Sequence, residues 1–463
     1  MEYINKDFLL ENETAKKLYH KYCEELPIID YHCHLNPMEI AENKKFRNIT
    51  ELWLGGDHYK WRLIRACGVP ENEITGDASD WTKFYNFAKI MPRIIGNPLY
   101  QWTHLELKRY FGYDGLLNEE TAETVWNLCN SKLENMTVRQ MMEMSNVIAV
   151  ATTDDPVDDL KAHEMIAADK SFNIAVIPAW RPDKAVNIDK DGFVDYIAKL
   201  ADVSKTEIKD FESLMTALVS RLEYFNAHGC CASDHGLDFV PYAETNTDEV
   251  DAIFRKALSG EKVTADEAEK YKCFILNKLH AEYVRLGWAS QLHYGAVRNV
   301  NTAKFAKLGP DTGFDCIGNS GDPVKITSFL NSLAKDNNLP RTVLYSTNPN
   351  DNYMLVALMN SFQDDSCRGK LQHGSAWWFN DTYNGMRNQL TALAEDGVLG
   401  NFIGMLTDSR SFISYPRHEY FRRLLCNLIG EWAESGKYPN DEKMLGKLVS
   451  DISFYNCKEY FCF

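Results

Sequence analysis

The sequence has no long apolar run, no excess of basic residues and no close-spaced cysteine framework. No stretch of its 463 residues approaches the roughly 18 uninterrupted apolar residues of a membrane span. Acidic residues outnumber basic ones by 66 to 50, and the resulting net charge of -16 repels phosphate backbones and anionic lipids. No local basic patch offsets this charge. We therefore expect neither a nucleic acid nor a membrane as a partner.

The cysteines and the first residues bear on the cellular compartment. The 12 cysteines include no Cys-x-x-Cys pair, which predicts reduced thiols rather than a disulfide scaffold. Residues 1–17 mix charges of both signs, so they lack the basic flank and apolar centre of a signal peptide. These features predict a cytoplasmic protein. The acidic surface with scattered aromatic residues fits a monomer or a homo-oligomer equally well.

A short apolar or β-branched run, followed by polar residues and then a helical pattern, recurs along the chain. This alternation predicts parallel βαβ units in an α/β fold. We expect eight strands, at residues 27–34, 146–150, 173–177, 229–233, 289–293, 342–345, 370–375 and 402–406. Eight units favour a distorted (β/α)₈ TIM-type barrel over an open sheet, although the fourth run is a poor strand by propensity.

The clearest helix lies between the fourth and fifth strands. Thr264 and Glu267 form a capping-box signature, apolar residues follow at helical spacing, and Gly287 is a suitable stop.

The interval between the first and second strands is far longer than one crossover helix requires. It contains aromatic-rich helical patterns punctuated by Gly, Pro and Asn. We interpret residues 37–144 as a mainly helical insertion near the barrel mouth, with residues 1–36 and 145–463 forming the barrel. A separately folding domain is the alternative.

The sharpest chemical signal is His32-Cys33-His34 at the end of the first strand. Side chains alternate on a strand, so His32 and His34 share a face and Cys33 points away. Two imidazoles so placed can bind one divalent cation, although two ordinary hydrogen-bonded histidines would give the same pattern. In a closed barrel the first and eighth strands are neighbours. Asp408, after the last strand, could therefore reach the same ion.

Other polar and aromatic residues follow predicted strand ends, where barrel enzymes place their active sites. These residues are Arg181, Asp234, His293, Arg298, Trp377 and Arg410. Each arginine alone could form a surface ion pair, and the tandem tryptophans could simply pack. Together, several arginines at one mouth favour an anionic substrate, because guanidinium binds carboxylate through two parallel N–H donors. In the insertion, the phenol of Tyr59 could transfer a proton if cations or a metal lowered its pKa.

Five separated motifs, in order along nearly the whole chain, resemble one known family. They are Asp30-Tyr-His-Cys-His34, Gly56-Asp-His-Tyr-Lys-Trp-Arg62, Gln291-Leu-His-Tyr-Gly-Ala-Val-Arg-Asn299, Trp377-Trp-Phe-Asn380 and Leu406-Thr-Asp-Ser-Arg410. The sequence is similar to uronate isomerase (glucuronate isomerase) of the amidohydrolase superfamily.

The resemblance implies an intramolecular oxidoreductase that converts D-glucuronate to D-fructuronate and D-galacturonate to D-tagaturonate. It implies one divalent metal ion, typically zinc and weakly bound, held by His32, His34 and Asp408. Arg181, His293, Arg298, Trp377 and Arg410 would line the sugar-acid site, with Arg410 and Tyr59 close to the reacting carbons.

The roles that follow are hypotheses. Asp408 is a candidate base for ring opening, and either Tyr59 or Asp408 for the proton transfer from C2 to C1. The alternative activity is a metal-dependent hydrolase of the same superfamily. Most such hydrolases carry a lysine after the fourth strand and a histidine after the sixth, and this sequence has neither. A sugar-acid-binding protein without catalytic activity is the third hypothesis.

Overall fold

The computed structural model describes residues 3–319 and 321–463, and its two main sheets are entirely parallel. One has the order β1 (Ile28–Asp30), β2 (Val147–Ala151), β3 (Ala175–Ile177). The other has the order β4 (Ala232–Leu237), β5 (Ala289–Tyr294), β8 (Thr342–Ser346), β9 (Leu371–His373). The backbone of Trp180 bridges Asp154, which follows β2, and Ser233 in β4, so it links the two sheets. The expected α/β class with parallel strands is confirmed.

Seven of the eight expected strands are present, but the strand expected over residues 402–406 is wrong. This segment has no regular secondary structure and forms no ladder. Two of its carbonyl groups accept hydrogen bonds from side chains instead. Asn456 Nδ2 donates to Phe402 O at 2.9 Å, and Tyr31 Oη donates to Gly404 O at 2.9 Å. Gly404 also has a positive φ of 78°, which interrupts an extended strand.

Beyond the interruption, the same segment lies against the end of β1. Asp408 N donates to His32 O at 3.2 Å, and His34 N donates to Ser409 O at 2.9 Å. Thr407 adds hydrogen bonds from its backbone and hydroxyl to the buried carboxylate of Asp30. The first and last predicted strands are therefore neighbours where the polar residues begin.

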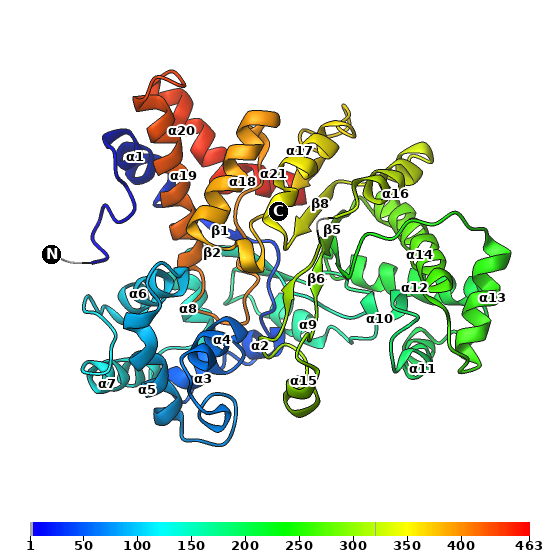
Figure 1. Cartoon of the computed structure of the whole chain (residues 1–463), viewed down its shortest axis with the longest axis horizontal. Coiled ribbons are helices and arrows are strands. Elements are labelled where there is room, and N and C mark those ends of the chain that lie inside the picture. Colours follow the sequence, from blue (N-terminus) through cyan, green and yellow to red (C-terminus); the bar gives the residue numbers. More distant parts are fainter. Residues whose placement is uncertain (1–2, 320) are drawn as a thin grey trace.

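The chain between β1 and β2 is helical and contains no strand in the described structure. Its helices are α2 (Pro37–Ala41), α3 (Ile49–Leu54), α4 (His58–Ala66), α5 (Asp80–Ile90), α6 (Pro98–Phe111), α7 (Ala122–Leu133) and α8 (Val138–Met144). Figure 1 shows them gathered on one side of the strands, in blue and cyan.

The remaining helices follow the strands or close the chain ends. They are α1 (Glu13–Leu18), α9 (Lys161–Ala168), α10 (Asp183–Val186), α11 (Phe193–Ser204), α12 (Phe211–Ala227), α13 (Thr247–Leu258), α14 (Ala265–Leu286), α15 (Thr302–Leu308), α16 (Pro323–Lys335), α17 (Asn352–Asn360), α18 (Tyr383–Asp396), α19 (Pro416–Glu434), α20 (Glu442–Ser450) and α21 (Asn456–Phe461). The capping box of Thr264 and Glu267 and the stop at Gly287 are confirmed for α14. None of the described helices is both long and apolar enough to cross a membrane.

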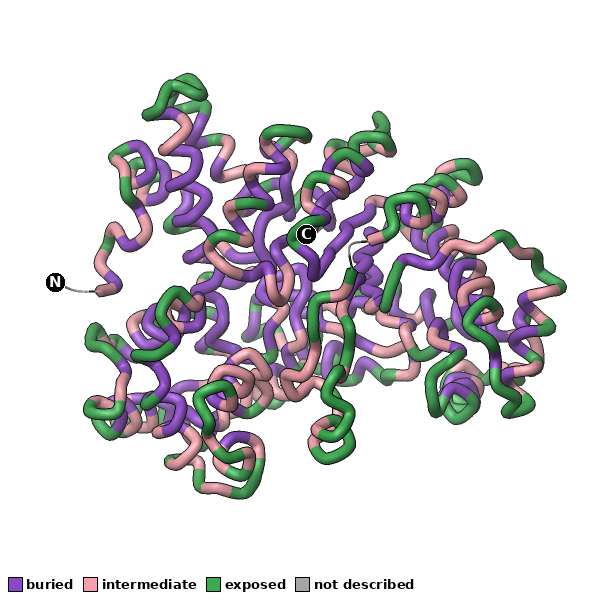
Figure 2. Tube along the Cα trace, viewed as in Figure 1, coloured by how far each residue is buried: buried purple, intermediate pink, exposed green. Residues whose placement is uncertain are grey.

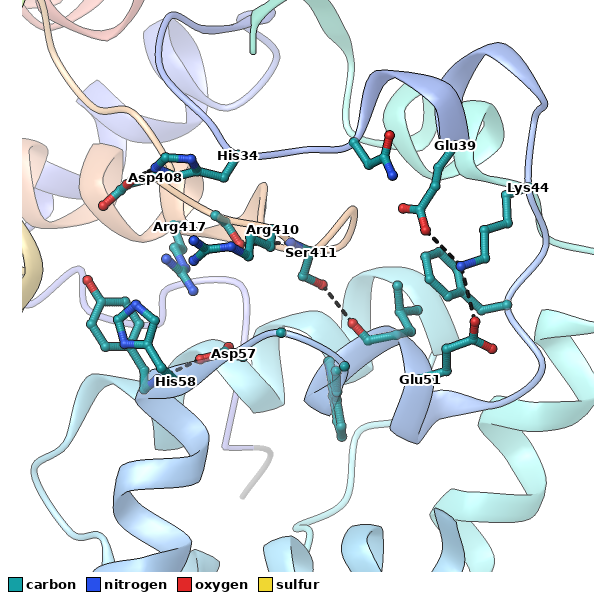
Figure 3. A pocket seen from close by; sticks show the side chains of 18 residues that line it. His34, Glu39, Lys44, Glu51, Asp57, His58, Asp408, Arg410, Ser411 and Arg417 are labelled. Carbon is teal, nitrogen blue, oxygen red and sulfur yellow. Dashed lines mark hydrogen bonds and ion pairs between the residues drawn. The ribbon is translucent and has the colours of Figure 1, made fainter. Parts of the chain in front are cut away.

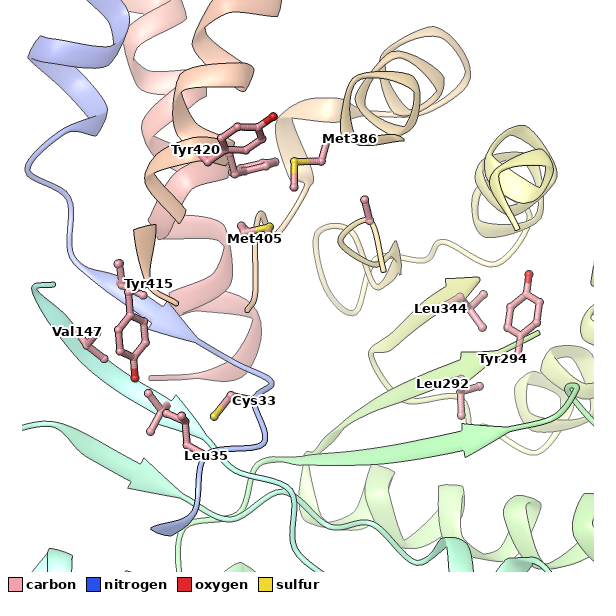
Figure 4. Close-up of a cluster of buried hydrophobic side chains, with 14 of the residues drawn as sticks. Cys33, Leu35, Val147, Leu292, Tyr294, Leu344, Met386, Met405, Tyr415 and Tyr420 are labelled. Carbon is pink, nitrogen blue, oxygen red and sulfur yellow. The ribbon is translucent and has the colours of Figure 1, made fainter. Parts of the chain in front are cut away.

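Alternation along the strands divides the core into an inner and an outer layer. Ile29 of β1 and Val343 and Tyr345 of β8 pack inside, over aromatic residues of α21. Ile28 and Leu344, one position away, join the layer under the surrounding helices. Figure 4 shows part of that outer layer, including Cys33 and Leu344, and Figure 2 shows the buried strands under a more exposed helical surface. Polar residues begin where the inner layer ends.

Candidate active site

His32, His34 and Asp408 converge at the carboxyl end of β1. His32 Nε2 lies 3.2 Å and His34 Nε2 lies 3.0 Å from the same oxygen, Asp408 Oδ1. Cys33 points the other way into the outer core, and its Sγ donates to Ala151 O at 3.2 Å. The alternation predicted from the His-x-His spacing is therefore confirmed.

Asp408 is held from both sides. Its Oδ2 accepts hydrogen bonds from the indoles of Trp377, at 3.0 Å, and Trp378, at 3.1 Å. Asp408 and Trp378 also have positive φ angles of 46° and 49°, a conformation that non-glycine residues rarely adopt. Such strain is maintained by surrounding contacts and concentrates at functional sites.

The charges at this cluster follow from its contacts. Burial alone would raise the pKa of Asp408, yet hydrogen bonds with His32 and His34 hold it well below its usual range. Burial lowers the pKa of His34 to about 4 despite the neighbouring carboxylate. Asp408 is therefore an anion at neutral pH.

A second polar group lies beside the first, at the ends of β4 and β5. His293 Nδ1 lies 2.8 Å and Arg181 Nη1 lies 3.1 Å from the buried carboxylate of Asp234, and His32 Nδ1 lies 3.9 Å from it. His235, one residue later on β4, faces the opposite way, where Tyr283 Oη approaches its Nε2 at 3.1 Å. The strand period thus brings Asp234 into the site and excludes His235.

Two cavities open onto these groups. The larger has a volume of about 530 Å³. All the site residues predicted from the sequence line it except Tyr59 and Asp234, and Asp234 is buried behind it. A neighbouring cavity of about 360 Å³ lies against α3 and α4 and shares His34, His58, Asp408 and Arg410 with the first (Figure 3). Both volumes lie in the range of small-molecule sites.

Tyr59 lines the second cavity, together with Asp408. The guanidinium of Arg417 lies 5.8 Å from its ring centre, and so does that of Arg62. The pKa of Tyr59 nevertheless lies well above its usual value, because burial and the charges of Asp381 and Asp408 outweigh both cations. Proton transfer by Tyr59 was expected to depend on a lowered pKa, and this condition is not met. The phenol stays protonated at neutral pH and can donate a hydrogen bond.

Three further residues belong to the site by position. His58 lines both cavities, and the Trp378 indole donates a hydrogen bond to Asp408. Asp311 forms ion pairs with Arg298 and Arg410. His58 and Trp378 lie within motifs that the sequence singles out. Asp311 lies in an irregular loop without any comparable signal.

The side chains present fit a divalent ion. Two neutral-imidazole nitrogens and one carboxylate are ligands that zinc and similar ions accept, and the ligand atoms of His32, His34 and Asp408 lie within 4.8 Å of one another. His32, Asp234 and His293 form a second such group that shares His32. His32 Nδ1 is buried and has no hydrogen-bond partner among the described residues.

Comparison with known proteins places this site in a family. The family model described as glucuronate isomerase matches residues 1–461. The chain belongs to the glucuronate isomerase family. It is 54% identical over 461 residues to the uronate isomerase of Caldicellulosiruptor saccharolyticus, covering all of this chain and 99% of that protein. It is also 50% identical to the uronate isomerase of Clostridium acetobutylicum, over 460 residues.

Solved structures of the glucuronate isomerase family have the same fold. The crystal structure of uronate isomerase from Thermotoga maritima matches with a TM-score of 0.94 at 36% identity, covering both chains completely. Glucuronate isomerase from Caulobacter crescentus matches with a TM-score of 0.91 at 24% identity, covering 99% of this chain and 97% of that one. At that identity the second likeness shows the fold alone.

Proposed function

We propose that this site interconverts D-glucuronate with D-fructuronate, and D-galacturonate with D-tagaturonate. Uronate isomerisation is the activity of the family to which the chain belongs. The observation that carries the proposal is the position of Asp408, which is ionised and bonded to two histidines and two indoles, beside a cavity lined by Arg181, Arg298 and Arg410.

The aldose ring has to open first. In our proposal the Asp408 carboxylate removes the proton from the anomeric hydroxyl, the bond between C1 and the ring oxygen breaks, and Asp408 passes that proton to the ring oxygen, which restores the carboxylate. Asp408 then removes the proton from C2, and the electron pair forms the C1–C2 double bond of an enediolate. The hydroxyl proton on O2 then passes to O1, C1 takes up the proton held by Asp408, and the ketone forms at C2, so atoms and electrons balance without any oxidant.

The surrounding residues supply a donor and positive charge for this sequence. Tyr59, whose high pKa keeps its phenol protonated, is suited to donate a hydrogen bond to a substrate oxygen. Arg410 stabilises negative charge that develops on the enediolate oxygens. Arg181 is already paired with Asp183 and Asp234. We therefore assign it to holding Asp234, the carboxylate behind His293.

His32, His34 and Asp408 would hold the divalent ion, which we propose to be zinc, weakly bound. When bound, such an ion polarises a substrate carbonyl or hydroxyl oxygen. Asp234 and the ring of His293 lie against His32 on the side opposite Asp408.

We also propose that the contacts between the Asp408 segment and β1 close a distorted (β/α)₈ barrel, with residues 37–144 as an insertion over its mouth. The thiols, all free in the structure, support a cytoplasmic location.

A hydrolase is not favoured, because the family and its curated relatives are isomerases. The test is incubation of the purified protein with D-glucuronate, D-galacturonate and D-glucose, followed by chromatographic detection of ketoses. Ketouronate from either acid, and no fructose from glucose, is expected. Unchanged uronates with metal supplied would contradict the proposal.

A further inference from the structure

The basic side chains that line the larger cavity are already paired with carboxylates. Arg181 contacts Asp183 and Asp234, and Lys190 contacts Asp238. Arg298 and Arg410 share the partner Asp311, and Arg298 Nε also lies 3.5 Å from Asp315 Oδ2. Arg298 Nη2 donates to Asp311 Oδ1, and Arg410 Nη2 lies 3.3 Å from Asp311 Oδ2.

Asp311 thus presents one carboxylate oxygen to each guanidinium, within the wall of the substrate cavity. Burial would raise the pKa of Asp311, but the charges of Arg298 and Arg410 lower it below its usual value. An anion therefore bridges the two arginines before any substrate enters. A uronate brings a carboxylate of the same shape and charge.

The segment that carries Asp311 is an excursion from the sheet. It leaves through β6 (Ala296–Val297) and returns through β7 (Cys316–Ile317), and these two strands form an antiparallel pair. α15, between them, has no buried residue. Figure 1 shows α15 projecting at the end of this hairpin, and Figure 2 shows that much of the hairpin is exposed.

The end of the hairpin rests on α4 of the helical region. Arg65 Nη1 donates to Thr312 O at 3.2 Å, and its guanidinium lies 4.3 Å from the centre of the Phe314 ring. Gly313 has a φ of 91°, and a Cβ there would approach His58 O to 3.1 Å. Asp311 is held next to the site by these contacts, yet its side chain remains 43% exposed.

We propose that Asp311 is a positioning residue that occupies Arg298 and Arg410 in place of substrate and is displaced when a sugar acid binds. The inference rests on the proposed function and adds a specificity device to it. A sugar acid supplies its own carboxylate to Arg298 and leaves Arg410 free to meet the enediolate oxygens, whereas a neutral sugar leaves Arg298 with only its longer contact to Asp315. Asp311 thereby favours sugar acids over neutral sugars. Because it has to be displaced, it also weakens the binding of the acids.

The test compares ligand binding to the wild type, Asp311→Asn and Asp311→Gly. Asparagine and glycine both tolerate the left-handed backbone of Asp311, which has a φ of 57°. The probe is D-gluconate, a sugar acid without a carbonyl group to isomerise, measured by titration calorimetry. Loss of a partly exposed ion pair predicts binding that is about three- to tenfold tighter in both variants.

Three comparisons accompany the binding measurement. D-glucitol, the neutral analogue, should gain no affinity. The KM for D-glucuronate should fall by the same factor as the gluconate Kd, while kcat changes less than twofold. Asp266→Asn, which removes an exposed carboxylate paired with Lys270, makes the same change in net charge and should alter neither constant.

Unchanged, weaker or undetectable gluconate binding in both Asp311 variants would overturn the inference, as would equal tightening of glucitol. The binding result does not depend on turnover. If the wild type produced no ketouronate, the proposed function would fail, while tighter gluconate binding would still establish the displacement of Asp311.

Discussion

The two walls of the site differ in construction. One is built from the ends of β1, β4 and β5 and the segment around Asp408, where His32, Asp234 and His293 are buried and lie against one another. The other is built from α4 and the hairpin that carries Arg298 and Asp311, whose side chains are partly exposed. We infer that the first wall, called the rigid wall below because its side chains are buried, performs the proton transfers, and that the second, the outer wall, recognises the acid.

The largest effect is expected at the centre of the rigid wall. Asp408→Asn keeps the shape but removes the anion that meets both histidines and both indoles. We expect kcat to fall by about a thousandfold or more, the scale of a lost acid–base group, with the fold intact. Steady-state kinetics and circular dichroism check this. Near-normal turnover would remove Asp408 from its role.

Arg410 lies between the two walls, two residues after Asp408. Arg410→Met should lower kcat/KM for uronates by about a hundredfold, because a donor to developing charge is lost while much of the side-chain volume is kept. The reduction should appear mainly in kcat. An unchanged kcat/KM would mean that negative charge develops elsewhere.

Arg298 belongs to the outer wall, and its substitution should separate recognition from chemistry. Arg298→Met is expected to raise the KM for D-glucuronate about tenfold and to change kcat much less, as for a group that binds ground and transition states equally. If kcat fell as steeply as in Arg410→Met, the division between the walls would be wrong.

The smallest effect concerns stability beneath the outer wall. Burial raises the pKa of Glu106 on α6 to about 7, against the opposing charges of Lys60 and Arg417. The folded protein therefore binds this proton more tightly than the unfolded chain does, and the resulting stability is lost as pH rises from about 4.5 through 7.

Glu106→Gln should remove this pH dependence. Between pH 5 and pH 8 the wild type should lose on the order of 1–3 kcal/mol of unfolding free energy relative to the variant, measured by urea denaturation. Exposed Glu143→Gln is the control and should follow the wild type. Parallel pH profiles for wild type and Glu106→Gln would contradict the expectation.

The rigid wall was largely predictable from the sequence. His32 and His34 lie two positions apart at a strand end, and Asp408 follows the last apolar run, so strand period and barrel order were enough to bring them together. Asp234 and His293 follow the same logic. Their positions depend on local patterns that one sequence displays.

The outer wall and the eighth strand depend on contacts that no local pattern contains. Asp311 meets Arg410, 99 residues away, from an irregular loop. The run at 402–406 has the composition of a strand, but Asn456 and Tyr31, distant in sequence, take its carbonyl groups. The high pKa of Tyr59 likewise arises from burial that only the folded chain creates.

The most direct test of isomerisation at this site is NMR of D-glucuronate and D-galacturonate incubated with the protein in D₂O, before and after chelation. We predict ketouronate, with deuterium at C2 of the aldose when the reaction runs back, because in our proposal Asp408 transfers a proton beside an open cavity. Ketouronate without deuterium would point to a shielded proton or a hydride shift. Both sugars recovered unchanged, with metal supplied, would contradict the central claim that this site is a uronate isomerase.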